Sequence, residues 1–509
     1  MKRNYAPRLS MVIAAVLVCM VVLSACGGGK ASEGAGTGGK SAAPTKISIM
    51  STFFTPEPPD DNDPIKKEIE KRTNTNLEIT WVSPNNYTEK SSVTLASGDI
   101  PDMLLVLNPF DPQVKMMAKQ GAFWDLTPFL PQYKNLSEGF PKASWDNLKM
   151  EGKNYGIPRV RPVVGGGSMP LLRNDWIEAL GLKFPETMDE LYTVLKAFTD
   201  QDPDGNGKKD TVGLAINAGA DNLGNLEFVE NVFNHSFGSW KLKDGKLTHT
   251  ALEPETKLAL QWLVNAYKDG VISADFATLK ATQLRDLVKA NKAGGWIDAV
   301  KPSWLLTGEM RKANPEADLL AVPYLSGPLG KYAPEEAGNY GMFVIPKSVK
   351  EDKVKSILSF MDYGASQEGW VLANFGLETT HYTAEEDLLT ATEEGKNILA
   401  RSGMPQIIAN LDKYERAVQV GIPLDFYKRN QRVIDERAAV AIKNEAYGLS
   451  SDTFDKYGKE YEKKMTDLKV KIILGNEPIE AWDKYVDSLK KDAQFMKMID
   501  EMDAALKAK

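Results

Sequence analysis

The stretch DPDGNGKKD, residues 202–210, combines the residue types and the spacing of a calcium-binding loop. Such a loop supplies oxygen ligands from its positions 1, 3, 5 and 9 and a backbone carbonyl from position 7, with a glycine at position 6. Position 12 is Gly213, where an EF-hand would place a bidentate glutamate. The alternative is a solvated turn without metal, because these residue types form turns unaided. The predicted calcium ligands are Asp202, Asp204, Asn206, Lys208 through its carbonyl oxygen, and Asp210.

A calcium ion in this loop would have a structural role. The loop lies between a predicted helix and the strand-like run TVGLAI, residues 211–216. A cation there would stabilise the helix-to-strand connection, since it would neutralise carboxylates that otherwise repel one another. The loop alone therefore says little about function.

Few residues are suited to catalysis by histidine. The chain has only His235, His249 and His381, and none has the H-x-x-x-H spacing of a metal site. No G-x-S-x-G motif accompanies them. Carboxylates are abundant, however, and the two acids of a glycosidase need only meet in space. We do not expect an enzyme, and the alternative that stays open is a surface-anchored glycosidase or lyase acting on polysaccharide.

The tryptophans indicate sugar recognition. The segment AGGWIDAVKPSW places Trp296 and Trp304 near the end of a predicted strand, beside Asp298 and Lys301. An indole face packs on the C–H face of a sugar ring, while carboxylates and amines bond the hydroxyls. The alternative is that both rings belong to the core. Helical spacing favours the core for Trp176, Trp262 and Trp482.

The first 25 residues have the pattern of an export signal, with basic residues before an apolar run from Leu9 to Ala25. The tetrapeptide LSAC resembles the lipobox of bacterial lipoproteins. This resemblance implies cleavage before Cys26 and acylation of its sulfur, for example with palmitate. Residues 26–45 are rich in glycine, serine and alanine and predict a flexible tether. The alternative is an uncleaved transmembrane anchor.

Charge and cysteine content limit the possible partners. The formal net charge is −7 without a basic stripe, so nucleic acid is not an expected partner. The only cysteines are Cys19, in the apolar run, and Cys26, so the mature chain has no disulfide and no thiolate metal site. The membrane is expected to be a partner only through the lipid anchor, on the extracytoplasmic face.

The rest of the chain is expected to form two lobes, because about 460 residues exceed what one hydrophobic core usually supports. From Lys350 onward the pattern is predominantly helical. The start of the chain alternates strand and helix, which predicts a parallel sheet covered on both faces with a crevice at the strand carboxyl ends. These strands and helices are expected in the order 46–50, 63–73, 77–82, 87–97 and 103–107.

Two segments are expected between the lobes. The glycines of VVGGGSM, residues 163–169, favour a hinge or tight bend over a phosphate loop, because no lysine follows them. The preceding YGIPRVRP places Arg159 and Arg161 on an interlobe loop, with a surface arginine pair as the alternative.

Together these features resemble the family 1 extracellular solute-binding proteins, lipoproteins that serve sugar ABC importers. The similarity runs from about Ile47 to Lys509. The chain looks closest to the branch that includes LplA/LipO-type lipoproteins and alginate-oligosaccharide-binding proteins, which the calcium-like loop and GLETTHYT, residues 376–383, both support. It departs from the branch at Thr211, where a glutamate ligand is common. The segments that carry the resemblance are ASGDIPDML, KNYGIPRV, LLRNDWIEALGLKFPETMDEL, KAGGWIDAV and GNYGMFVIPKSVKEDKVKSILSFMDY.

The resemblance implies an α/β fold with two lobes, of the periplasmic-binding-protein type II, with three interlobe crossings and a helical C-terminal region. The matched motifs place the crossings near 158–166, 292–299 and 338–344. The implied N-terminal lobe comprises 46–160 plus 295–340, and the implied C-terminal lobe comprises 161–294 plus 341–509.

The resemblance also implies a function. The protein would be a monomer that captures an oligosaccharide in the interlobe cleft by hinge closure and delivers it to the permease subunits of an ABC importer, without catalysis. Its cofactor would be structural calcium. The implied ligand-binding residues are Asn108, Asp111, Arg159, Arg161, Trp296, Asp298, Trp304, Asn339, Tyr340, Glu378 and His381.

Overall fold

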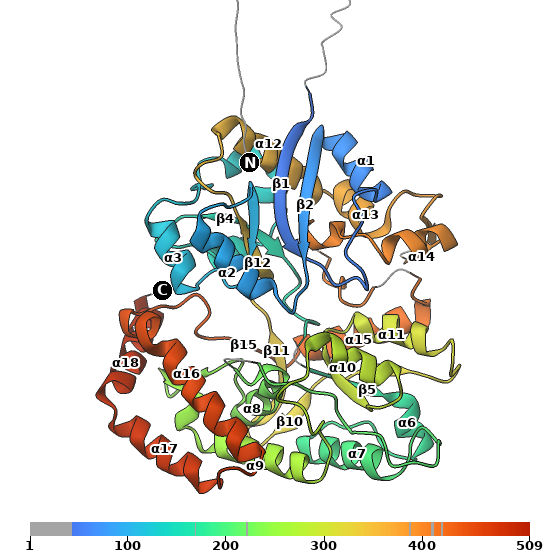
Figure 1. Ribbon diagram of the computed structural model, residues 1–509, viewed down its shortest axis with the longest axis vertical. Coiled ribbons are helices and arrows are strands. Elements are labelled where there is room, and N and C mark those ends of the chain that lie inside the picture. The colour runs from blue at the N-terminus through green and yellow to red at the C-terminus, as the bar shows by residue number, and fades with distance from the viewer. Residues whose placement is uncertain are drawn as a thin grey trace, which may run out of the picture. The chain divides into compact units, whose positions relative to one another are not determined.

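The computed structural model describes residues 43–167, 169–219, 222–385, 388–408, 412–418 and 421–508. The predicted signal, Cys26 and most of the tether lie outside these residues. Residues Pro44–Lys509 form one compact unit, in which separate sheets and two large hydrophobic cores define two lobes (Figure 1). None of the described helices combines the length and the apolar character that crossing a bilayer requires.

The first lobe is built on a five-stranded sheet in the order β2-β1-β3-β12-β4. β1 pairs in parallel with β2 and β3, and β12 runs antiparallel to β3 and β4. The expected alternation of strands and helices at the start of the chain is confirmed. These elements are β1 (Thr45–Thr52), α1 (Pro64–Thr73), β2 (Thr75–Val82), α2 (Tyr87–Ser97), β3 (Met103–Val106), α3 (Pro112–Lys119), η1 (Leu130–Gln132), α4 (Lys134–Ser137), α5 (Lys142–Asp146) and β4 (Gly156–Val160).

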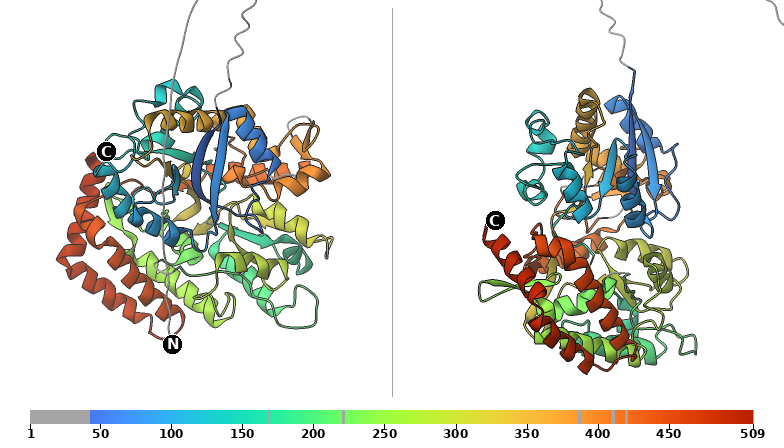
Figure 2. Two further views of the ribbon diagram at one scale, coloured as in Figure 1. Left: turned by 45° about the horizontal axis from the view of Figure 1, so that its top comes forward. Right: turned by 60° about the vertical axis from the view of Figure 1, so that its left-hand side comes forward.

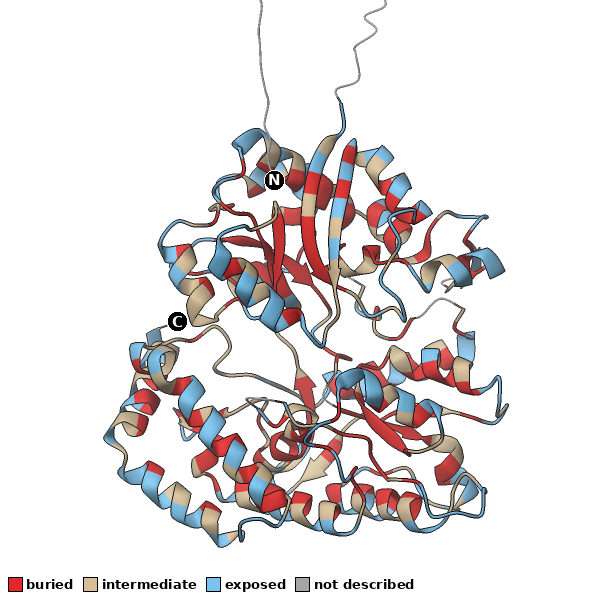
Figure 3. Cartoon of the chain, in the orientation of Figure 1, coloured by how far each residue is buried: buried red, intermediate tan, exposed pale blue. Residues whose placement is uncertain are grey.

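Local signals define the ends of these elements. Asp63 caps α1, since its carboxylate accepts the Ile65 N–H at 2.8 Å, and a proline occupies the first turn. Gly98 ends α2 in the left-handed conformation. β3 and β4 are buried along their whole length, as expected for strands covered on both faces (Figure 3).

The first lobe is completed by a later part of the chain. The core around β1 and β3 also contains Val354, Ile357, Leu372 and Ile407. These later elements are β12 (Asn339–Val344), α12 (Glu351–Ala365), α13 (Gln367–Phe375), β13 (Tyr382–Glu385), β14 (Leu388–Ala391), α14 (Glu393–Leu399) and η4 (Met404–Gln406).

The second lobe contains two three-stranded sheets, β8-β5-β9 and β10-β11-β15, and the hairpin β6-β7. Trp176, Trp262 and Trp482 lie in its core, as their spacing predicts. Its elements before β12 are β5 (Met169–Arg173), α6 (Asn174–Ala179), α7 (Met188–Asp200), η2 (Gly224–Leu226), α8 (Glu227–Asn234), β6 (Trp240–Lys243), β7 (Lys246–His249), η3 (Thr250–Leu252), α9 (Pro254–Lys268), α10 (Ala281–Lys289), β8 (Gly295–Asp298), α11 (Pro302–Met310), β9 (Leu319–Ala321), β10 (Leu325–Gly327) and β11 (Gly330–Glu335).

The C-terminal region returns to the second lobe and is mainly helical, as predicted. Its long helices α16 to α18 follow one another in red in both views of Figure 2, and α16 contacts α9 and α18. Tyr461, Met465 and Phe495 join the second-lobe core. The elements are α15 (Leu424–Ala438), β15 (Ala441–Lys443), α16 (Asp452–Ile473), α17 (Glu480–Lys491) and α18 (Ala493–Ala508).

The residues that the structure describes place three crossings between the lobes, and one predicted crossing is wrong. The first crossing follows β4, and another lies between β11 and β12, near the predicted positions. Residues 292–299 do not cross, because β8 pairs with β5 inside the second lobe. A side chain at Gly294 or Gly295 would collide with the Phe198 ring or the Leu171 carbonyl, so these glycines allow close packing instead of a hinge. The remaining crossing lies between Ile408 and Ala417.

The predicted lobe boundaries are corrected accordingly. β8, α11, β9, β10 and β11, within 295–340, belong to the second lobe. The segment from β12 to η4, assigned to the C-terminal lobe by the motifs, belongs to the first. The run TVGLAI also differs from its expectation, since it makes isolated bridges such as Ala215 to Trp296 in place of a continuous strand.

Candidate ligand-binding site

Four residues lie at one edge of the first sheet, next to the crossings. Phe54 follows β1, Asn108 follows β3, Arg159 lies near the end of β4, and Tyr340 lies at the start of β12. Because β12 runs antiparallel to β3 and β4, its start lies at the edge where those strands end. Parallel α/β sheets bind ligands at this carboxyl edge. The four residues are called the edge site below.

Two aromatic rings of the edge site are open to solvent. Phe54 is 41% exposed and Tyr340 is 42% exposed. Their centroids lie 6.5 Å apart in an edge-on arrangement. Exposed aromatic rings in contact provide the apolar faces on which sugar rings pack.

Arg159 lies against the Tyr340 ring of this pair and is 2% exposed. Its guanidinium carbon is 4.9 Å from the centroid of the Tyr340 ring. Its Nη2 donates to the side-chain oxygen of Gln406 in η4. Burial and the neighbouring charge of Arg161 lower the pKa of Arg159 well below its ordinary value.

Arg161 is also buried, but two of its nitrogens have carbonyl partners. Its Nη1 donates to the Val160 carbonyl at 2.7 Å and its Nη2 to the Pro405 carbonyl at 2.7 Å. Burial lowers its pKa to about 10. Arg161 therefore connects the first crossing to the segment around η4. Since Arg159 and Arg161 are both buried, they do not form the surface arginine pair that was the alternative from the sequence.

Further charged groups surround the crossings from the second lobe. Glu415 is buried, with Lys301 Nζ at 3.2 Å and Arg416 Nε at 3.3 Å. Although burial opposes its charge, Lys301, Arg416 and Arg161 together lower the pKa of Glu415 to about 2.

Arg437 of α15 donates to the Val322 carbonyl at 2.8 Å and to the Gly166 carbonyl at 3.3 Å. Glu336 lies against Gly166, where a larger residue would collide with its carboxylate.

Trp296 does not provide the stacking platform predicted for it. The side chain is 1% exposed and belongs to a core with Leu171 and Leu319. Its Nε1 donates to Asp298 Oδ2 at 3.0 Å, and Arg285 pairs with the same carboxylate at 2.6 Å. The core alternative is therefore the correct one for Trp296, because its strand β8 pairs with β5 and packs against α10.

Trp304, Glu378 and His381 lie apart from the edge site, around one small apolar cluster. Trp304 packs edge-on against Phe426 at 5.0 Å, in a cluster that also contains Tyr382. His381 is 2% exposed, and its Nδ1 accepts the Leu377 N–H at 3.0 Å. Glu378 is exposed on the same turn. This cluster joins the segment after α13 to α15 of the second lobe.

Three other predicted ligand residues hold local structure or bridge the lobes. Asn108 is exposed, and its Oδ1 accepts the Phe110 N–H at 3.2 Å. Asp111 caps α3 and pairs with Lys459 of α16 at 2.7 Å. Asn339 accepts the Tyr447 hydroxyl at 3.1 Å, a contact between β12 and the second lobe.

The predicted calcium loop is held by hydrogen bonds between its own residues. Asp202 accepts the N–H groups of Asn206 at 3.2 Å and Gly207 at 2.8 Å. Desolvation and the adjacent Asp202 raise the pKa of Asp204, as expected for carboxyl groups held close together. Asp210 instead pairs with Lys292 at 2.5 Å. Among the residues that the structure describes, no three histidine, cysteine or acidic side chains converge as metal ligands.

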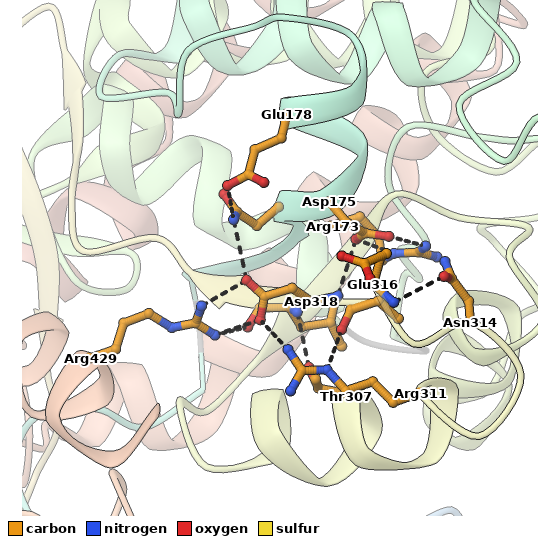
Figure 4. A network of polar contacts seen from close by, with 12 residues as sticks. Arg173, Asp175, Glu178, Thr307, Arg311, Asn314, Glu316, Asp318 and Arg429 are labelled. Carbon is orange, nitrogen blue, oxygen red and sulfur yellow. Dashed lines mark hydrogen bonds and ion pairs between the residues drawn. The ribbon is translucent and has the colours of Figure 1, made fainter. Parts of the chain in front are cut away.

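The second lobe holds α15 through a separate polar network (Figure 4). Arg429 of α15 makes two contacts with Asp318, at 2.7 Å and 2.8 Å, and Asn174 donates to the same carboxylate at 3.2 Å. Thr307 of α11 accepts the Leu319 N–H at 3.0 Å. α15 is thereby fixed to the lobe, so Arg437 on it has a defined position beside the first crossing.

Phe54 and Gln406 were missed by the sequence reasoning. Phe54 had a usable signal, since it follows a predicted strand at the edge where parallel sheets bind ligands. Gln406 had none, because it reaches Arg159 across 247 residues of chain.

The two lobes, the three crossings and the carboxyl-edge site define the chain as a solute-binding protein of the bacterial extracellular type. The family model of the bacterial extracellular solute-binding proteins matches residues 56–369, and the chain belongs to this family.

Similar proteins support this assignment and confirm the predicted branch. The chain is 32% identical to lipoprotein LipO of Bacillus subtilis (strain 168), over 87% of this chain and 89% of LipO. It is 30% identical to the polygalacturonan/rhamnogalacturonan-binding protein YtcQ of the same organism, over 94% of both chains. A crystal structure of the alginate-binding protein AlgQ2 without calcium ion superimposes with a TM-score of 0.67 at 20% identity, covering 92% of this chain and 98% of that one. This last similarity shows the fold.

Proposed function

We propose that this protein captures an oligosaccharide between its lobes and delivers it to the permease of an ABC importer. The observation that carries the proposal is the edge site, where exposed Tyr340 contacts both exposed Phe54 and buried Arg159. Aromatic faces beside a few polar groups suit a sugar. One similar protein, YtcQ, is named for binding polygalacturonan and rhamnogalacturonan.

The three crossings would let the lobes close around a ligand, and this mechanism makes and breaks no covalent bond. A ligand that touches both lobes stabilises the arrangement in which they are closed, and that arrangement is what a permease would recognise. Asn108, Arg159, Asn339 and Tyr340 are the proposed contacts on the first lobe. Trp304, Asp298, Glu378 and His381 remain weaker candidates, because each is already engaged or lies elsewhere.

A lipid anchor at Cys26 would keep the protein at the extracytoplasmic face of the membrane. The support is the LSAC tetrapeptide and the glycine-rich tether. In a Cys26→Ala variant we expect release to the medium or retention as uncleaved precursor. Mature protein that stays with the membrane in that variant would contradict the anchor.

Calcium is proposed as a structural ion of the loop. Asp202, Asp204, Asn206 and the Lys208 carbonyl would hold it, and Asp210 would join them only by leaving Lys292. The ion would neutralise the paired carboxylates and so stabilise the connection after α7.

The test is a panel of oligosaccharides in a thermal-shift assay, since a ligand that binds only the folded state raises the melting temperature. We expect stabilisation by at least one oligosaccharide, lost in the Phe54→Ala and Tyr340→Ala variants. New reducing ends after incubation with polysaccharide would show an enzyme instead. Absence of stabilisation by every glycan would overturn the proposal.

A further inference from the structure

Asn206 and Gly207 form the only asparagine–glycine pair in the chain. Both residues are exposed, in the loop that follows α7. The backbone nitrogen after an asparagine can attack the carbon of its side-chain amide, and a side chain on that next residue hinders the approach. Gly207 has φ +77°, and a Cβ built on it would meet no described residue beyond its chain neighbours within 4 Å. The approach to the Asn206 amide is therefore open.

The loop makes a hydrogen bond to each of the three atoms that this attack involves. The attacking nitrogen, of Gly207, donates to Asp202 Oδ2 at 2.8 Å. The oxygen of the attacked amide, Asn206 Oδ1, accepts the Lys208 N–H at 2.8 Å. The nitrogen that would leave, Asn206 Nδ2, donates to Asp204 Oδ2 at 2.7 Å. The side chain is thereby held beside the backbone nitrogen that attacks it.

These contacts favour the attack. A carboxylate that accepts an N–H draws the proton away from the nitrogen, so the nitrogen has more electron density to share. A backbone N–H at the amide oxygen stabilises the negative charge that develops there, as the donors of an oxyanion hole do. Holding the two groups in one geometry also removes the entropy cost of bringing them together. A flexible segment with the same two residues has none of these advantages.

From this geometry we infer that Asn206 is a site of self-modification, at which the loop converts its own asparagine to aspartate or isoaspartate through a succinimide ring. The bond from the Gly207 nitrogen to Asn206 Cγ forms, and the Cγ–Nδ2 bond breaks. The proton of the Gly207 N–H passes to solvent, and solvent returns a proton to Nδ2, which leaves as ammonia. One water molecule then opens the ring at either of its carbonyl carbons. Solvent water is the only co-reactant.

The product loop differs in charge and in hydrogen bonding. A neutral amide becomes a carboxylate among the acidic side chains of the loop. The donor Nδ2, which joins Asp204 Oδ2 at 2.7 Å to Asp210 Oδ1 at 3.2 Å, is lost. Carboxylates that lie close together repel one another. The modified chain is therefore more acidic, and its loop is held less firmly.

The test follows the full chain during incubation in neutral buffer that contains chelator, so that no cation occupies the Asn206 oxygen. Peptide mass spectrometry measures the fraction of chains in which residue 206 has changed from amide to acid. The same chain unfolded in guanidinium chloride gives the reference rate. We expect modification about 10-fold faster in the folded chain, the lower end of what a hydrogen bond to a charged group contributes.

Two controls define the background. Asn476 is exposed but is followed by Glu477, so it should stay an amide over the same period. In an Asn206→Gln variant the longer side chain would have to close a larger ring, and no acidic form should appear. Ion-exchange chromatography provides a second readout, because each modified chain carries one more negative charge.

An Asp202→Asn variant locates the effect in the loop. The substitution keeps the size of the side chain and removes its charge, and the introduced amide precedes Pro203, whose nitrogen carries no proton to lose. We expect the rate at Asn206 to fall to that of the unfolded chain. An unchanged rate in this variant would overturn the role of the loop contacts. An Asn206 that stays an amide in the folded chain, or changes more slowly there than in denaturant, would overturn the inference.

Discussion

Lys115 of the first lobe and Asp455 of the second meet in an ion pair, with Nζ 2.5 Å from Oδ2. The same Nζ donates to Ser450 at 2.5 Å. One turn away, Lys459 pairs with Asp111 at 2.7 Å. α3 and α16 belong to different hydrophobic cores, so these contacts hold the two lobes together away from the crossings.

Removing this ion pair is expected to loosen the lobes. Partly buried pairs of this kind contribute about 1 kcal/mol, so Lys115→Met should shift the open-to-closed equilibrium about fivefold toward open. Small-angle X-ray scattering of the unliganded chain should show a larger radius of gyration. The control is Lys142→Met, which removes a pair with Asp146 inside the first lobe. Identical scattering from the two variants would refute the interlobe role.

Glu415 is expected to make the stability of the fold depend on pH in the acidic range. Its pKa is lowered from the ordinary 4.5 to about 2 in the folded chain, so its contribution to stability is complete above pH 4.5 and is lost as the pH falls toward 2. The size is on the order of 3 kcal/mol. In Glu415→Gln the melting temperature should be lower at pH 7 and should fall less steeply between pH 5 and 3.

Glu351→Gln serves as the control for that measurement, because Glu351 lies on the surface beside Lys355. Its melting profile should follow that of the unmodified chain. A Glu415→Gln profile parallel to both would show that the buried carboxylate does not titrate as proposed.

The loop at 202–210 is expected to respond to calcium. Addition of calcium should raise the melting temperature and chelator should lower it, because the cation offsets repulsion between Asp202 and Asp204. An Asp204→Ala variant should be insensitive to both. Sugar affinity measured well below the melting temperature should not change, since the loop lies outside the edge site. Loss of sugar binding on chelation would place the ion in the ligand site.

Trp296 is expected to matter for folding more than for contact with a ligand. Its replacement by alanine empties a buried site and should cost about 3 to 5 kcal/mol, measured by denaturant unfolding. Trp304→Ala should cost less, because that ring is only partly buried. If the Trp296→Ala chain has normal stability but binds sugar more weakly, Trp296 contacts the ligand as predicted from the sequence.

Local features were predictable from the sequence. The alternation of β1, α1, β2, α2 and β3 follows from short apolar runs between amphipathic segments, and this signal depends only on neighbouring residues. Core positions such as Trp176 and Trp482 follow from helical spacing in the same way. The family follows from motifs spread over the chain.

Long-range relationships required the tertiary structure. A pair of glycines such as 294 and 295 looks the same in the sequence whether it forms a hinge or allows close packing. Here the glycines allow the close approach of Phe198 and Leu171, so the crossing predicted at 292–299 was wrong. The sequence around Asp111 does not distinguish an aspartate that binds a ligand from one that pairs with a distant lysine, here Lys459.

The sequence by itself determined the first strands and helices and the pattern of an export signal, because these depend on residue type at short spacing, and its motifs determined the family. Only the tertiary structure decided which charges lack partners. Arg159 is defined by Tyr340, Gln406 and Arg416, which lie 181 or more residues away along the chain. Burial and electrostatic balance depend on three-dimensional distance, and no local pattern encodes that distance.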